Sequence, residues 1–166
     1  MKIHTLLFLV SLLVLLACSK SEDVTENVAP EPAPNPFENL VDKYYILVSS
    51  TSNPAYPDTF VGSSTNIYSD YYALPCILDD LRMFKSNGDC VYDNGPLRCS
   101  PLDSQTVTVK WRFIENNTKI QIYNTSNSIT TDLKILINDG TTFKYEKTMK
   151  YGNDSFVWTE TWKVKK

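Results

Sequence analysis

Residues 142–164 read TFKYEKTMKYGNDSFVWTETWKV, and this stretch decides the fold class. On either side of Gly152-Asn153-Asp154, aromatic and aliphatic side chains recur at every second position, and mostly charged or hydroxyl side chains lie between them. Such alternation is typical of a half-buried β-strand, because successive side chains of a strand point to opposite faces. Two alternating runs joined by a short turn segment predict an antiparallel hairpin.

The same period of two recurs upstream, over residues 106–114, 119–122 and 132–138. Turn signals separate the runs, namely Asn87-Gly88, Asn94-Gly95, Asn116-Asn117 and Asp139-Gly140. With residues 43–48, 78–84 and 90–92 added, the chain contains about eight antiparallel strands, and only residues 54–72 are irregular enough for a turn or two of helix. A sheet with one apolar face must close on itself or pack against a second sheet. The sequence therefore predicts an all-β meander.

The first eighteen residues have the pattern of a secretory signal peptide. A cationic start, Met1-Lys2, precedes an apolar run that ends at Leu15-Leu16-Ala17-Cys18. This ending resembles the lipobox of bacterial lipoproteins, which implies removal of residues 1–17 and lipidation of Cys18. The alternative is an ordinary signal peptide in which Cys18 has no special role.

Residues 18–36 are predicted to form a tether. Prolines at alternate positions from Pro30 to Pro36 favour an extended polyproline-II conformation, and acidic residues keep the segment solvated. Acidic residues soon after the cysteine also resemble the surface-export signal of Bacteroidota lipoproteins. We therefore expect a chain held at the outer membrane by its lipid, facing either the periplasm or the cell surface. No second apolar stretch approaches the length of a membrane-spanning helix.

Removal of the signal peptide restricts the possible chemistry. The single histidine, His4, is lost with it, so the mature chain lacks the usual general base at neutral pH and the commonest metal ligand. Loss of Lys2 lowers the formal net charge from −3 to −4, which gives no electrostatic reason to bind nucleic acid. We expect no catalytic residues, no metal, no cofactor and no nucleic-acid partner.

A scattered set of residues carries a family resemblance: Cys76, Asp79-Asp80, Phe84, Asn87-Gly88, Gly95, Cys99, Trp111-Arg112-Phe113 and the strand with Ile120 and Ile122. With this set, residues 42–162 resemble the lipocalin-like domain of small bacterial lipoproteins. The Gly-x-Trp of a first lipocalin strand is absent near Asp42-Lys43-Tyr44. The resemblance implies that residues 37–166 form a lipocalin-like barrel of about eight antiparallel strands, which can hold one small ligand.

Three cysteines remain in the mature domain, Cys76, Cys90 and Cys99. If Asn87-Gly88 is a two-residue turn, the numbers of paired residues sum to 175, and Cys76 lies opposite Cys99. This register predicts a Cys76–Cys99 disulfide and leaves Cys90 as a thiol. A Cys90–Cys99 bridge is the main alternative.

Lys147 and Glu160 break the pattern, since each occupies the apolar face of its strand. With Asn153-Asp154 as the turn, paired numbers sum to 307, and the two residues lie directly opposite each other. A buried unpaired charge is very costly, so we expect an ion pair. It is either a structural pair in the barrel wall or the polar end of an aromatic cavity. The predicted cavity residues are Trp111, Phe113, Tyr145, Lys147, Trp158, Glu160 and Trp162.

Two main functional hypotheses follow. The first is a lipoprotein whose barrel binds a small apolar or amphipathic ligand, and it requires an enclosed cavity. The second is a non-enzymatic accessory module of a cell-envelope complex, with a filled barrel and an exposed apolar patch among residues 56–72. An enzyme would need Lys147 or Glu160 to be connected to solvent with a strongly perturbed pKa.

Overall fold

The computed structural model describes residues 35–57, 62–124, 126 and 129–166. The signal peptide, Cys18 and the tether as far as residue 34 lie outside the described residues, so their assignment stays a prediction.

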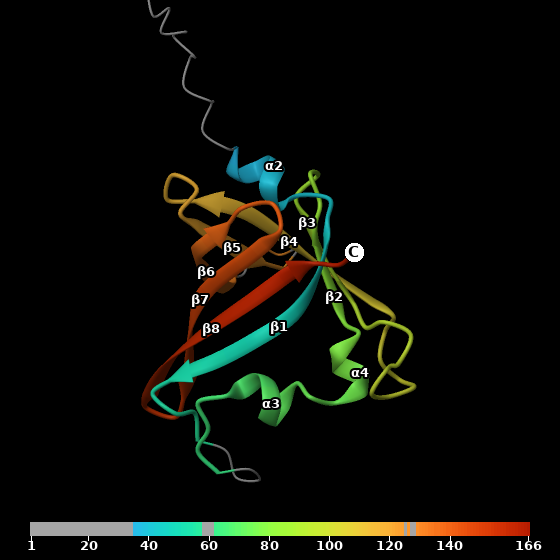
Figure 1. The fold of residues 1–166 in the computed structure, drawn as a ribbon. Coiled ribbons are helices and arrows are strands. Elements are labelled where there is room, and N and C mark those ends of the chain that lie inside the picture. The colour runs from blue at the N-terminus through green and yellow to red at the C-terminus, as the bar shows by residue number, and fades with distance from the viewer. Residues whose placement is uncertain (1–34, 58–61, 125, 127–128) are drawn as a thin grey trace, which may run out of the picture. The chain divides into compact units, whose positions relative to one another are not determined.

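The described chain forms a closed barrel of antiparallel strands in which each strand pairs with the next along the chain and β8 pairs with β1 (Figure 1). The strands are β1 (Tyr44–Asn53), β2 (Leu81–Phe84), β3 (Asp89–Asp93), β4 (Thr106–Ile114), β5 (Lys119–Tyr123), β6 (Ile129–Asn138), β7 (Thr142–Tyr151) and β8 (Asp154–Val164). This arrangement confirms the predicted all-β fold and its closure.

Three short helices accompany the strands: α2 (Pro36–Leu40), α3 (Ile67–Tyr71) and α4 (Pro75–Leu78). Figure 1 shows α2 at one end of the barrel and α3 and α4 at the other. Helix α2 starts at Pro36, a residue that was predicted to belong to the tether. It starts there because proline suits the first helical position and the Asn35 side chain caps the Phe37 amide. Pro75 likewise starts α4, so the predicted strand from residue 78 begins only at Leu81.

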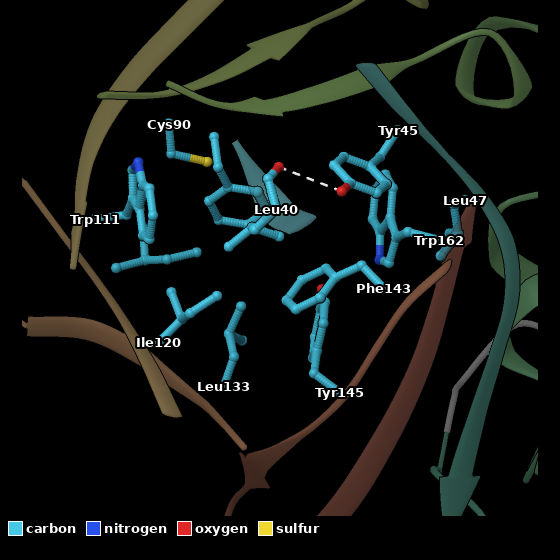
Figure 2. Packing of buried hydrophobic residues seen from close by; sticks show 12 residues of the cluster. Leu40, Tyr45, Leu47, Cys90, Trp111, Ile120, Leu133, Phe143, Tyr145 and Trp162 are labelled. Carbon is cyan, nitrogen blue, oxygen red and sulfur yellow. Dashed lines mark hydrogen bonds between the residues drawn. The ribbon is translucent and has the colours of Figure 1, made fainter. Parts of the chain in front are cut away.

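The end of the barrel near α2 is filled with packed side chains. Leu40 of α2 is fully buried among rings and aliphatic residues of the strands, and Figure 2 shows it within that cluster. The Tyr45 hydroxyl donates a hydrogen bond to the Leu40 carbonyl, and the Phe37 ring stacks on Trp111 with centroids 6.0 Å apart. Helix α2 therefore closes this end of the barrel.

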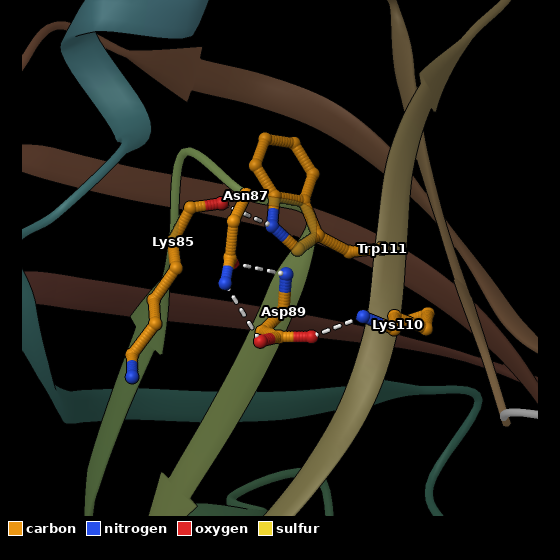
Figure 3. A network of polar contacts seen from close by, with 5 residues as sticks. All are labelled: Lys85, Asn87, Asp89, Lys110 and Trp111. Atoms are coloured by element: carbon orange, nitrogen blue, oxygen red, sulfur yellow. Dashed lines mark hydrogen bonds and ion pairs between the residues drawn. The ribbon is translucent and has the colours of Figure 1, made fainter.

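The β2–β3 hairpin has a different turn from the predicted one. Residues 86–88 form a three-residue loop, with the Gly88 amide donating to the Lys85 carbonyl and Gly88 at φ 84°. A type I′ turn needs positive φ at both central residues, and Asn87 does not adopt it. Instead the Asn87 side chain accepts from the Asp89 amide, while Asp89 pairs with Lys110 of β4 (Figure 3). The observed sum is 174, with Phe84 opposite Cys90, so the register of 175 was wrong.

The Cys76–Cys99 disulfide is confirmed, but not for the reason that predicted it. Cys76 belongs to α4 and Cys99 to the loop between β3 and β4, and their Cα atoms are 5.0 Å apart. The bridge therefore joins two segments outside the strand ladder. Cys90 is buried and carries a free thiol, as expected.

In the β7–β8 hairpin the numbers of paired residues sum to an odd value, as predicted, but the register is shifted. Its two-residue turn is Gly152-Asn153, with Gly152 at φ 60°, the conformation that a type II′ turn requires at its first central position. Paired numbers sum to 305, so Lys147 lies opposite Trp158 and Glu160 opposite Tyr145. The directly opposed Lys147–Glu160 pair was wrong. Because the sum is still odd, both residues keep the same face of the sheet as the aromatic side chains.

Candidate functional site

Glu160 of β8 is the centre of a polar cluster inside the barrel. Its side chain is 2% exposed, and its Oε1 lies 2.6 Å from the Lys147 Nζ on the neighbouring strand. The other oxygen, Oε2, accepts hydrogen bonds from the Tyr145 hydroxyl and, at 3.1 Å, from the Trp162 indole. The two pattern-breaking residues therefore form an ion pair, reached diagonally across the hairpin.

Arg82 of β2 brings a second cation into the cluster. It is 8% exposed, and its Nη1 donates to the Tyr145 hydroxyl at 2.7 Å. The guanidinium carbon lies 4.1 Å from the centre of the Trp162 ring and 4.7 Å from that of Tyr92, both within the range of a cation–π contact. Its Nε is buried and finds no hydrogen-bond partner in the described part of the chain.

The protonation states follow from these contacts. Burial would raise the pKa of Glu160, but Lys147 and Arg82 outweigh it and hold that pKa below its ordinary value. Burial raises the pKa of Tyr145 well above 10, so the phenol stays neutral, accepting from Arg82 and donating to Glu160. Burial opposes the charge of Arg82, yet Tyr145, Tyr92 and Glu160 raise its pKa. The cluster therefore holds two cations, Lys147 and Arg82, beside one carboxylate, that of Glu160.

A cavity of about 170 Å³ adjoins this cluster. Its walls combine apolar and aromatic side chains with the charged groups, and its residues come from five strands, the β1–β2 connection and the loop after β3. They are Leu47, Tyr72, Ile77, Asp80, Leu81, Arg82, Tyr92, Asp93, Asn94, Lys147, Glu160 and Trp162. An engineered cavity of roughly 150 Å³ in another protein binds benzene, so this space suits a small molecule or one end of a larger one.

The segment between β1 and β2 forms one wall of the cavity. Tyr72 directly follows α3, and Ile77 belongs to α4, which the Cys76–Cys99 disulfide fastens to the loop after β3. Burial, with a smaller contribution from Glu160, raises the pKa of Tyr72 to about 12, so its hydroxyl is neutral. The disulfide therefore holds two of the segments that line the cavity against each other.

Besides Glu160, the cavity has two acidic residues, Asp80 and Asp93, which lie where the chain enters β2 and where it leaves β3. Burial and the nearby carboxylates of Asp79 and Asp93 raise the pKa of Asp80 to about 6. Asp93 accepts hydrogen bonds from the Gly95 amide and the Gln105 side chain. Within the residues that the structure describes, no group of histidine, cysteine or acidic side chains is arranged to hold a metal ion.

Four of the seven predicted cavity residues take part in this site. Lys147, Glu160 and Trp162 line the cavity, and Tyr145 joins Glu160 to Arg82. Trp158 lies under the Lys147 ammonium, 5.2 Å from ring centre to nitrogen, and packs in a separate cluster with Ile67 and Phe156.

The structure does not bring Trp111 and Phe113 to the cavity. Their rings contact each other, and Trp111 also packs against Phe37 and Phe84 in the main core. Its indole donates to the Lys85 carbonyl of the β2–β3 turn (Figure 3).

Three residues of the cavity wall, Arg82, Tyr72 and Tyr92, were not among the predicted cavity residues. Arg82 is two residues before the buried Phe84 and so shares its inward face, which makes it a third charge against the pattern. The alternation did not reveal Arg82 as an exception, because Leu81 and Met83, on the opposite face, are apolar as well.

The sequence matches no protein-family model and no curated protein sequence. Among the described residues, no helix has the length and apolar character needed to cross a bilayer.

Proposed function

We propose that this chain is a membrane-anchored lipoprotein whose lipocalin-like barrel binds a small amphipathic ligand in the cavity beside Glu160. The observation that carries the proposal is the cavity itself, which has apolar walls and a few converging polar groups. Ligand pockets commonly combine these two features, and an eight-stranded barrel can enclose one small ligand. The ligand places an apolar body against Leu47, Tyr72 and Ile77 and a polar group at the charged cluster.

The anchoring part of the proposal rests on residues 15–18 and on the acidic, proline-rich segment that follows them. A lipidated Cys18 would hold the barrel at the outer membrane, facing either the periplasm or the cell surface. Two or more acyl chains give stable anchoring, since each buried methylene contributes about 0.8 kcal/mol.

One observation favours a second candidate function, docking to a protein of the cell envelope. Large apolar side chains are exposed in and near the segments joined by the disulfide, and Leu102 is 93% exposed. The others are Leu74, Leu78 and Leu97. Of the expected patch at residues 56–72, the described residues 56–57 and 62–72 contribute no large exposed apolar side chain, and Tyr56 packs against Tyr71, Phe156 and Trp158. Residues 58–61 lie outside the described part of the chain.

The cavity is tested by filling it. In the chain carrying Cys18→Ser, which cannot be lipidated, binding of the neutral fluorescent probe N-phenyl-1-naphthylamine, of 1-octanol and of octanoate would be titrated. Leu47→Trp places a bulky ring in the cavity, whereas Val48→Trp adds the same ring to the outer face of β1. We expect the first variant to lose binding and the second to keep it.

Equal binding by both variants would place the ligand elsewhere. If octanol, octanoate and the probe all fail to bind the parent chain, ligand binding is refuted and the docking function remains.

A further inference from the structure

We infer that the ligand is a small carboxylic acid and that the Arg82 guanidinium binds its carboxylate. This inference rests on the proposed function and goes beyond it by naming the ligand's chemical class and the residue that recognises it.

The charges of Lys147, Arg82 and Glu160 do not balance. Both oxygens of Glu160 are engaged: Oε1 pairs with Lys147, and Oε2 accepts from Tyr145 and Trp162. The carboxylate of Glu160 acts on both Lys147 and Arg82 but cannot neutralise two cations, so the three groups together keep a net positive charge. Arg82 is left with a neutral phenol as its hydrogen-bonded partner and with the faces of aromatic rings. A buried cation without a matched anion is costly, and an anionic ligand would remove that cost.

Arg82 also has a hydrogen-bond donor, its Nε, without an acceptor among the described residues. The residue lines the cavity and is more than nine-tenths buried. A buried donor without an acceptor is rare in a folded protein and needs an explanation. The planar guanidinium presents its donors in a fork that matches the two oxygens of a carboxylate. Contacts with Trp162 and Tyr92 and the bond to Tyr145 hold the group in place before any ligand arrives.

Two other carboxylates, those of Asp80 and Asp93, lie on the cavity wall. Asp93 accepts hydrogen bonds from Gly95 and Gln105, and in the described part of the chain no ion pair joins Arg82 to Asp80 or Asp93. Neither acid neutralises the guanidinium. At neutral pH, Asp80 adds negative charge to the wall and so opposes a carboxylate ligand. Removing that charge should therefore tighten the binding of an acid and leave an uncharged analogue unaffected.

The size of the space limits the acid. About 170 Å³ with walls that include Leu47, Tyr72 and Ile77 fits a short aliphatic or monocyclic aromatic acid, or the head of a longer chain that extends outwards.

Isothermal titration of the Cys18→Ser chain with octanoate and octanamide tests the inference, with benzoate and benzamide as a second matched pair. We expect each acid to bind at least tenfold more tightly than its amide, since hydrogen bonds between charged groups are about twice as strong as neutral ones. Arg82→Met should abolish this preference. Arg112→Met is the control, because it removes the same charge from an exposed arginine on the outer face of β4.

Asp80→Asn keeps the inference testable if Arg82→Met does not fold. This variant should tighten octanoate binding severalfold and leave octanamide unchanged. Equal affinities for acid and amide in the parent chain would overturn the inference and leave the proposed function standing. A folded Arg82→Met that still prefers the acid, or an Asp80→Asn that does not tighten octanoate, would also overturn it. Binding of none of these probes would refute the proposed function itself.

Discussion

The buried Lys147–Glu160 pair makes a quantitative prediction about stability. The side chains are 16% and 2% exposed, and the charged atoms are 2.6 Å apart. Glu160→Leu leaves the Lys147 ammonium without its ion-pair partner, and Lys147→Met does the same to the Glu160 carboxylate. Breaking a buried pair in this way costs about 3–5 kcal/mol of unfolding free energy for each single change.

The double variant should cost much less than the sum of the two. Once both charges are gone, neither is stranded, and Met and Leu fill similar space with apolar groups. The double variant still lacks the acceptor for the Tyr145 hydroxyl and the Trp162 indole. Each unsatisfied group costs roughly 1–3 kcal/mol of unfolding free energy, and Glu160→Leu alone has the same cost. The coupling energy between the two positions should therefore reach about 2 kcal/mol.

Urea unfolding of the four chains, followed by circular dichroism, measures this coupling. The control is the pair between Lys134 and Glu146 on the outer face, where the charged atoms are 3.2 Å apart and the side chains are 61% and 32% exposed. There, Lys134→Met and Glu146→Leu should each cost about 0–1 kcal/mol and add. Single-variant costs at Lys147 and Glu160 that also add, to within about 0.5 kcal/mol, would refute a coupled buried pair.

Three further predictions concern other parts of the chain. Cys18→Ser should move the protein from the membrane to the soluble fraction on cell fractionation, and a variant that stays membrane-bound and processed as before would refute lipidation. Non-reducing peptide mapping should recover Cys76 joined to Cys99 with Cys90 free, and Cys99→Ser should lower the unfolding free energy by about 3 kcal/mol, the loss expected when a loop of 23 residues is no longer closed. Because burial and the neighbouring carboxylates raise the pKa of Asp80 to about 6, the fold favours the protonated acid, and stability falls as pH rises from about 4 through 6. Asp80→Asn should therefore stabilise the protein by about 1 kcal/mol at pH 7.5, a value reduced by solvent screening, and by almost nothing at pH 4; equal gains at both pH values would contradict this origin.

The strands could be predicted because burial of one face imposes a period of two that the sequence must obey. All eight observed strands overlap the predicted ones, and the even or odd parity of the β7–β8 pairing was predicted correctly. The registers were wrong because they depend on turn conformation. Asn87-Gly88 forms the end of a three-residue loop, and Gly152-Asn153 forms the turn that was assigned to Asn153-Asp154. A positive φ at a single glycine, as at Gly88 and Gly152, is compatible with more than one type of turn. The residue types alone therefore did not determine which turn forms.

The candidate site could be predicted only in part, because inward-facing aromatic residues recur at both ends of the barrel. Their alternation along the strands therefore does not tell which end holds the cavity. Trp111 and Trp162 occupy equivalent inward positions in their strands, yet Trp111 packs under α2 and Trp162 lines a cavity. What separates them is the entry of Leu40 from α2, which fills one end of the barrel with an apolar side chain. At the other end of the barrel, three inward positions carry charged side chains, those of Arg82, Lys147 and Glu160. Other inward positions there carry aromatic residues. Charged groups need hydrogen-bonding partners and so prevent close apolar packing around them. The three inward charges therefore mark which end of the barrel keeps an internal space, and Arg82, the charge that the alternation concealed, is the one that we propose a ligand neutralises.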